Sequence, residues 1–568
     1  MKKILLRLMF LAMLVALLPV HVAQACSAFI VGKDLTADGS TLFGRTEDYP
    51  YAPDGGRHNK NYVVVPAKTY KDGDKLEDES TGFSYPHLAS EMKYTAVYDS
   101  DRGNGSNGDF GAHGFNEAGV SMTATVSATP NDKVLKQDPL VENGLAEAAM
   151  VDLALPRSKT AREVIENVAK VIEEKGSAEG NIIVAADKNE LWYMEILSGH
   201  QYVAIKFPTN KYAVFANTYY LGHVDLNDKE NVIASKDVEE VAKKADNYKT
   251  DKDGNFMIAK SYGPDEYMER NRSRTYAGIK WMDPQAKVNY DDEAFDLLRE
   301  PTDPNKKYTV HDVIAEQRDR FETLPQYKAD DLVEVGKKID GNVYKYALGN
   351  ENVIDAHVYQ IKPNLPNAFG GVMWLGLAQS RNTPYVPFYG NVEDTYEAFK
   401  NRSTKYDGKS WYWTVWHIDQ MVMKYPEIFG NSIQEKWKAK EAEWDKEQTE
   451  RDAKYANYTD EQAKAAGPEV TKEALERSEK IFKEIKAVEA EMEEKIKKEK
   501  GKDADLVYTG YNKANLLAEA EKGKSADKAS DTKKDSSSQT TWIVIGVLVV
   551  LVGGFFGYKQ FNKKKEEE

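Results

Sequence analysis

A single cysteine, Cys26, is the feature that most limits how this 568-residue chain can fold. One thiol excludes an internal disulfide framework, a cysteine zinc knuckle and a Cys-x-x-Cys redox centre. The fold must therefore rest on a packed hydrophobic core. A chain of this length with 41% hydrophobic residues can bury one large domain or several smaller ones.

The first 25 residues predict a cleaved secretory signal. Lys2 and Lys3 precede an apolar stretch at residues 8–18, and Ala23-Gln24-Ala25 forms an A-x-A cleavage site. Cleavage after Ala25 makes Cys26 the first residue of the mature chain.

The other end of the chain predicts a membrane anchor. Residues 541–558 are apolar and close to the lower length limit for a bilayer span, and a lysine-rich tail follows at residues 559–568. The positive-inside rule leaves that tail in the cytoplasm and the bulk of the chain outside. The alternative, a buried core helix, has nothing after it to pack into. Residues 521–540 are small and polar and predict a flexible linker.

Two regions remain between the signal and the linker. Residues 26–430 are interpreted as a catalytic domain, and residues 431–520 as a charged helical extension that either packs on that domain or stands as a stalk. The formal net charge of -15 argues against nucleic-acid partners, because an acidic chain repels phosphate backbones. The number of subunits is left open.

The segment around Cys26 predicts a β-hairpin. Residues 26–32 are apolar and β-branched, Asp38-Gly39 is a turn signal, and residues 41–46 form a returning strand. If paired residue numbers sum to about 73, Cys26 lies opposite position 47, and Arg45 and Asp48 flank it.

That position gives the cysteine a chemical use. A mature N-terminal cysteine carries a thiol and a free α-amine, and an amine pKa of about 7.7 to 8.0 suits a general base at neutral pH. The nucleophile and its base then belong to one residue, so no histidine partner is needed. Asp48 can hold the amine, while the charge of Arg45 favours the thiolate.

Simpler interpretations exist for each of these residues. Arg45 and Asp48 can form an ordinary surface ion pair, and a lone buried cysteine is usually inert packing. A lipid-modified cysteine after a signal is a third alternative, although Ala23 and Gln24 do not fit the usual residues ahead of such a cysteine.

The sequence from residue 26 to 48, CSAFIVGKDLTADGSTLFGRTED, resembles the mature start of dipeptidases of peptidase family C69, which are cysteine members of the N-terminal nucleophile (Ntn) hydrolases. The likeness continues in order through residues 114–128, 186–200, 212–222, 357–366, 383–391 and 410–418.

The resemblance implies an α+β fold, a four-layer αββα Ntn-hydrolase sandwich, here followed by the charged extension and one C-terminal transmembrane helix. It also implies a catalytic set. Cys26 matches the nucleophile, Arg45 and Asp48 match an Arg-x-x-Asp element, Asn217 matches an oxyanion donor, and Arg274 matches a later arginine, with Arg272 close by as an alternative.

Sequence patterns independently predict helices packed on antiparallel sheet. Residues 182–185, 191–197, 202–207 and 212–216 read as short strands joined by tight turns, in one antiparallel meander. Residues 159–175 carry valine and isoleucine on one helical face, and Gly176 ends that helix.

These observations predict a surface dipeptidase that acts on dipeptides through Cys26 and is held to the membrane by its C-terminal span. The nine histidines show no zinc-peptidase motif, so no metal or other cofactor is expected. Two rival functions stay open: an Ntn acylase acting on N-acyl amino acids or conjugated bile salts, and a lipid-modified binding ectodomain without chemistry.

Overall fold

The computed structural model describes residues 26–49, 58–78, 81–100, 110–322, 338–339, 342–343 and 347–508. The predicted signal, linker, membrane span and tail lie outside these residues. Within them, no helix is both long and apolar enough to cross a membrane. All of them belong to one compact unit, Met1–Lys513, and a second unit, Ala514–Glu568, lies outside the described residues.

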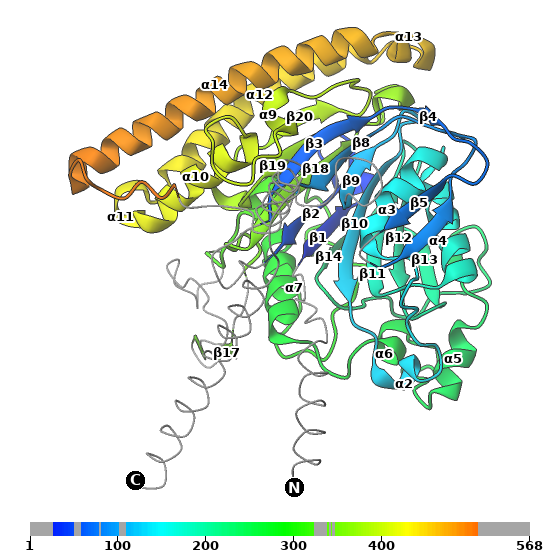
Figure 1. Cartoon of the computed structure of the whole chain (residues 1–568). Coiled ribbons are helices and arrows are strands. Elements are labelled where there is room, and N and C mark those ends of the chain that lie inside the picture. The colour runs from blue at the N-terminus through cyan, green and yellow to red at the C-terminus, as the bar shows by residue number, and fades with distance from the viewer. Residues whose placement is uncertain are drawn as a thin grey trace, which may run out of the picture. The chain divides into compact units, whose positions relative to one another are not determined.

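One antiparallel sheet has eight strands in the order β15-β13-β12-β11-β10-β9-β8-β3 (Figure 1). Its strands are β3 (Lys60–Val65), β8 (Tyr94–Asp99), β9 (Gly111–Phe115), β10 (Ser121–Ala128), β11 (Gly180–Ala186), β12 (Leu191–Ile196), β13 (Tyr202–Lys206) and β15 (Val232–Ala234).

The second antiparallel sheet has six strands in the order β14-β1-β2-β18-β19-β20. Its strands are β1 (Ser27–Val31), β2 (Thr41–Asp48), β14 (Tyr212–Phe215), β18 (Val353–Ile361), β19 (Val372–Leu377) and β20 (Val386–Tyr389). The α+β class with antiparallel sheets is thus confirmed.

The two sheets face each other. Aromatic residues from opposite sheets meet in the space between them, with ring centroids 4.8 Å apart for Phe115 and Tyr359 and 5.2 Å apart for Tyr193 and Phe215. Alternation sets this contact: along β12, Tyr193 packs toward the other sheet, whereas Trp192 and Met194 pack in the core beneath the helices.

Helices cover the outer face of each sheet. Against the eight-stranded sheet lie α3 (Glu147–Ala154) and α4 (Ala161–Lys175). Against the six-stranded sheet lie α7 (Glu269–Met282), α8 (Val310–Gln317), α10 (Trp411–Lys424) and α12 (Ser432–Tyr455). The predicted helix at residues 159–175 is α4, and Gly176, at φ +77°, follows it as expected.

Shorter elements complete the described residues. They are the strands β4 (Lys68–Thr69), β5 (Lys75–Asp78), β6 (Phe83–Pro86), β7 (Ser90–Glu91), β16 (Lys338–Ile339) and β17 (Asn342–Val343), and the helices α2 (Asp132–Leu135), α5 (Val238–Lys244), α6 (Ile258–Tyr262), α9 (Glu397–Lys400), α11 (Pro426–Phe429), α13 (Asp460–Ala465) and α14 (Gly467–Lys500). Short 3-10 turns are η1 (Lys33–Leu35), η2 (Leu155–Arg157), η3 (Asn367–Phe369) and η4 (Ser380–Asn382).

The predicted single meander is wrong in its last strand. β11, β12 and β13 pair in sequence, but β14 leaves them and pairs with β1 in the other sheet, with Phe215 opposite Ala28. Pro208, between β13 and β14, has no N–H for a ladder bond, and the free edge of β13 is taken by β15. This crossover brings residue 217 to Cys26.

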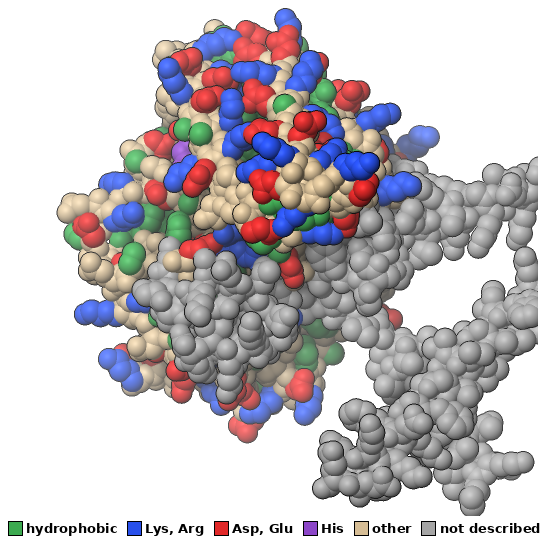
Figure 2. Space-filling model, turned by 90° about the vertical axis from the view of Figure 1, so that its left-hand side faces the viewer, with side chains coloured by type: hydrophobic (Ala, Val, Ile, Leu, Met, Phe, Trp, Pro, Cys, Tyr) green, Lys and Arg blue, Asp and Glu red, His purple; other side chains and the backbone are tan. Residues whose placement is uncertain are grey.

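The charged helices after residue 431 pack on the main domain. Trp437 and Trp444 of α12 and Ile481 and Ile485 of α14 are buried in the core that also contains β1 and β2. Their exposed positions are rich in Lys and Glu, and basic and acidic side chains are interspersed on the face of the molecule shown in Figure 2. Pairs such as Lys436–Glu491, at 2.7 Å, link the two helices.

Candidate active site

The hairpin of β1 and β2 sets the position of Cys26. The register pairs Ser27 with Thr46 and Ala28 with Arg45, so the expected pairing sum of 73 is confirmed. Cys26 therefore comes opposite Glu47, at the edge of the space between the sheets. Its side chain is fully buried, and Arg45 Nη1 donates to its sulfur at 3.6 Å.

Arg274 of α7 lies on the other side of the cysteine. Its Nη1 donates to the backbone carbonyl of Cys26 and, at 3.1 Å, to Ser27 Oγ. The neighbouring Arg272 instead donates to the carbonyls of Tyr290 and Asp292. Of the two arginines considered from the sequence, only Arg274 thus reaches Cys26 among the described contacts.

Asn217 follows β14 and joins the same cluster. Arg274 Nη2 donates to Asn217 Oδ1 at 2.8 Å and to Asn271 Oδ1 at 2.9 Å, and Asn271 Nδ2 donates to the Asn217 carbonyl at 2.6 Å. With its oxygen held by Arg274, the buried Asn217 Nδ2 has no partner among the described residues. An orientated N–H donor without a partner suits the stabilisation of an oxyanion.

Asp48 ends β2 and is fully buried. Its Oδ2 accepts from Asn350 Nδ2 at 2.6 Å. Burial raises the pKa of Asp48 to about 7, although the charge of Arg274 and the Asn350 hydrogen bond both lower it. The carboxyl therefore titrates near neutral pH and responds to any cation placed beside it.

Burial dominates the thiol itself. It raises the pKa of Cys26 to about 12, and the opposing charge of Arg45 does not compensate. The nearby carboxylates of Glu47, Asp48 and Glu147 raise it further. The thiol of the full chain is thus protonated at neutral pH, and Arg45 alone does not create a thiolate. A base close to the sulfur is required.

The five predicted residues therefore lie together, but their catalytic roles remain predictions. Sequence reasoning missed Asn271 and Asn350, which orientate Asn217 and Asp48, and Glu47, which accepts from Arg45 Nη2 at 2.8 Å. Glu47 was visible as the residue opposite Cys26 in the predicted register. The two asparagines are distant in sequence and gave no signal.

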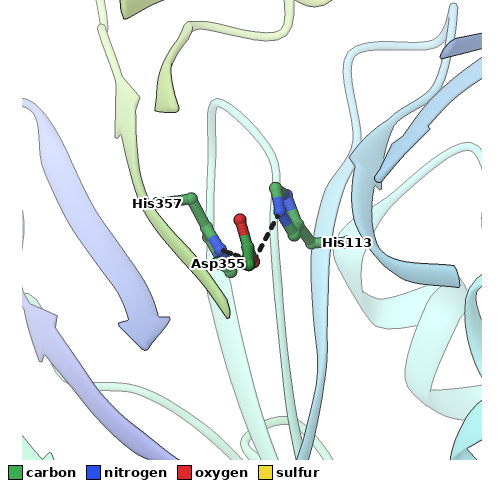
Figure 3. Close-up of side chains that lie close together, drawn as sticks. All are labelled: His113, Asp355 and His357. Atoms are coloured by element: carbon green, nitrogen blue, oxygen red, sulfur yellow. Dashed lines mark hydrogen bonds and ion pairs between the residues drawn. The ribbon is translucent and has the colours of Figure 1, made fainter. Parts of the chain in front are cut away.

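A hydrogen-bonded trio lies deeper between the sheets (Figure 3). Asp355 Oδ2 is 3.1 Å from both His113 Nε2 and His357 Nδ1, and His357 Nε2 contacts Thr123 Oγ1 at 3.0 Å. Burial and the neighbouring His113 lower the pKa of His357 to about 3, so His357 is neutral. His357 thus bonds Asp355 and Thr123 in the manner of a structural residue.

The same three residues have the composition of a metal site. The two rings are stacked, with centroids 3.5 Å apart and planes 20° from parallel, and His113 Nε2 and His357 Nδ1 both face the same Asp355 oxygen at 3.1 Å. The arrangement fits two histidines sharing one carboxylate better than a metal centre.

The chain is similar to known peptidases along most of its length. The model of peptidase family C69 matches residues 25–478, which include all five site residues. "Probable dipeptidase B" of Streptococcus pyogenes serotype M1 is 48% identical over 486 residues, 84% of this chain and 95% of that protein. "Probable dipeptidase" of Latilactobacillus sakei is 32% identical over 393 residues, 69% of this chain and 79% of that protein.

The chain belongs to peptidase family C69 and is an enzyme of the peptidase class. Among solved structures, a conjugated bile acid hydrolase from Clostridium perfringens has 12% sequence identity to this chain and a TM-score of 0.24, over 62% of this chain and 89% of that one.

Proposed function

We propose that this protein is a cell-surface dipeptidase whose nucleophile is Cys26, exposed as a mature N-terminus when residues 1–25 are removed. Its catalytic domain is a four-layer αββα Ntn-hydrolase sandwich. Residues 541–558 span the membrane and hold this domain on the outer face of the cell. The dipeptidase names of the relatives over most of their length support the substrate class.

The contacts of Cys26 support the proposal most strongly. The residue after the predicted cleavage site lies between Arg45, at 3.6 Å from its sulfur, and Arg274, which holds its carbonyl. Cleavage converts the Cys26 backbone nitrogen into an amine adjacent to its own thiol. This amine supplies the base that the buried thiol requires.

The reaction follows from these positions. The α-amine takes the thiol proton, and the sulfur attacks the carbonyl of the first residue of the dipeptide. Asn217 Nδ2 donates to the oxygen that becomes negative, and the protonated amine gives its proton to the leaving amino group. Water activated by the amine then releases the first residue from the thioester.

A substrate panel tests the activity. The chain beginning at Cys26 should hydrolyse dipeptides, and should leave the same sequences with an acetylated amine and conjugated bile salts far less changed. Cys26→Ala should remove the activity while the protein stays folded. Preference for the acylated compounds would identify an Ntn acylase, and full activity in Cys26→Ala would contradict the proposed nucleophile.

Cell fractionation tests the location. The full chain should fractionate with membranes and be digested by protease added to intact cells. The same chain ending at residue 540 should appear in the medium. Retention of both forms inside the cell would contradict the surface assignment.

A further inference from the structure

A row of alternating charges leads away from Cys26 into the space between the sheets. Arg45 donates to the Cys26 sulfur with one nitrogen and, with the other, to Glu47 Oε2 at 2.8 Å. The other oxygen of Glu47 lies 2.6 Å from Lys60 Nζ, and Lys60 Nζ lies 2.5 Å from Asp99 Oδ1.

This row links the two sheets. Arg45 and Glu47 belong to β2 of the six-stranded sheet, whereas Lys60 and Asp99 belong to β3 and β8 of the eight-stranded sheet. The Lys60 side chain is fully buried. Burial alone would lower the pKa of Lys60, but Asp99 and Glu47 outweigh it, so the lysine stays charged.

A buried lysine held between two carboxylates is an unusual structural choice. Apolar residues of similar volume would pack a sheet interface at least as well as a buried ion pair. The row begins at the Cys26 sulfur, which Arg45 contacts. Glu47 is shared between Arg45 and Lys60. Whatever neutralises Glu47 therefore governs how strongly Glu47 attracts Arg45.

We propose that Lys60 is a positioning residue for the reaction: by neutralising Glu47 from the opposite sheet, it leaves the Arg45 guanidinium available to the Cys26 sulfur. This inference rests on the proposed role of Cys26 as the nucleophile. Among the described residues, the ion pairs of Lys60 are with Glu47 and Asp99, so it acts on the sulfur through Glu47 and Arg45.

The charges around the sulfur mean that removing Lys60 and removing the charge of Glu47 have opposite effects on the pKa of the Cys26 thiol. Arg45 of β2 lowers the pKa of the Cys26 thiol, while Glu47 and Asp48 of β2 and Glu147 of α3 raise it. Arg274 of α7 faces the same cysteine. Without Lys60, Glu47 draws Arg45 away from the sulfur and the thiol pKa rises. Without the Glu47 charge, the thiol pKa falls.

Alkylation of Cys26 by iodoacetamide as a function of pH measures this directly, because Cys26 is the sole thiol. In the chain beginning at Cys26, Lys60→Met should move the alkylation midpoint up by about one pH unit, and Glu47→Gln should move it down. Lys60→Met should also lower kcat about tenfold with little change in KM. Lys60→Arg, which keeps the charge, should stay near wild type.

Glu441→Gln is the matched control, since it breaks the buried ion pair between Glu441 of α12 and Arg318, the residue that follows α8. It should lower the melting temperature without moving the midpoint. If Lys60→Met does not fold, the double variant Lys60→Met/Glu47→Gln decides, because its midpoint should lie no higher than wild type.

Shifts of the same sign in Lys60→Met and Glu47→Gln, an unchanged midpoint in Lys60→Met, or a raised midpoint in the double variant would each overturn the proposal. The alkylation readout does not depend on peptide hydrolysis. Failure of the positioning role is therefore distinguishable from failure of the proposed nucleophile, which the activity of Cys26→Ala reports, and from failure of the dipeptidase assignment, which the substrate panel reports.

Discussion

Two buried arginines differ in the groups that bind them: Arg274 lies beside Cys26, and Arg318 lies where α8 meets α12. Arg318 binds both carboxylate oxygens of Glu441, at 2.9 and 2.5 Å, and also donates to the carbonyls of Ser380 and Thr383. Arg274 donates only to neutral oxygens, and it forms no ion pair with any residue in the described part of the chain.

The electrostatic result differs accordingly. Burial lowers the pKa of Arg274, and the attraction of Asp48 does not restore it. Burial also acts on Arg318, but Glu441 raises its pKa above the ordinary value. The charge of Arg318, which joins α12 to the domain, is neutralised by direct contact with Glu441. The charge of Arg274 has no carboxylate in direct contact among the described residues. It acts on the Asp48 carboxyl, the Asn217 amide and the Cys26 carbonyl around it.

Breaking the Arg318 pair is expected to have the largest effect on folding. Arg318→Met leaves Glu441 buried without its cation, and removing one partner of such a pair costs about 3–5 kcal/mol. The free energy of unfolding, from denaturant titration, should fall by that amount. Activity per folded molecule should not change, and a selective loss of kcat would remove the contrast between the two arginines.

Arg274→Met should show the reverse pattern. Asn217 loses the bond that orientates its free N–H, and loss of one oxyanion donor typically lowers kcat about 10²–10³-fold. Steady-state kinetics on a dipeptide should show this fall with a smaller loss of stability than in Arg318→Met. Equal stability losses with unchanged kcat would place Arg274 with Arg318 as a structural residue.

The pH dependence of stability sharpens the comparison at Asp48. Its folded pKa of about 7 lies above the unfolded value of about 3.9, so its contribution to stability is fully present below about pH 4 and is lost as the pH rises through 7.

In a chain that retains Ala25, wild type should lose up to about 1.4 kcal/mol per pH unit relative to Asp48→Asn across that window. Glu195 and Glu316, whose pKa values burial also raises, are present in both chains and cancel in the difference. Denaturant titrations at several pH values measure it. Parallel stability curves would show that Asp48 titrates at its ordinary pKa.

The surface ion pair between α12 and α14 is expected to have the smallest effect on stability. Lys436 and Glu491 are 2.7 Å apart but exposed, and exposed pairs contribute about 0–1 kcal/mol. Lys436→Ala should change the free energy of unfolding by less than about 0.5 kcal/mol and leave kcat unchanged. A larger loss would mean that the α12–α14 contact depends on surface charge more than on Trp437 and Ile481.

Local patterns in the sequence predicted the parts of the site that lie close together along the chain. The turn at Asp38-Gly39 and the apolar strands on either side determine the hairpin register, and that register places Arg45 and Glu47 beside Cys26. The helix α4 could likewise be predicted, from its one apolar face and the glycine at its end.

Contacts between residues distant in the sequence could not be predicted from local patterns. The exchange of β14 into the other sheet depends on the competition of β15 for β13, which no single window of sequence contains. Lys60, Asn271 and Asn350 likewise contact Glu47, Asn217 and Asp48, respectively, across the fold. Asn217 and Arg274 were found only through the family resemblance.

The extension also belongs more closely to the enzyme than its composition indicated. Its charged surface predicted solvated helices, yet the family match continues to residue 478, and Trp437 and Trp444 are buried in the main core. Alternating buried tryptophans and exposed Lys and Glu are typical of one helix face packed on a domain.

The mature N-terminus of the purified protein tests the account most directly, because the base in the proposed reaction is the α-amine of Cys26. Intact-mass and terminal-peptide mass spectrometry should find a chain that begins at unmodified Cys26. A lipid-modified Cys26, or a chain that begins upstream of it, would remove the base and contradict the account.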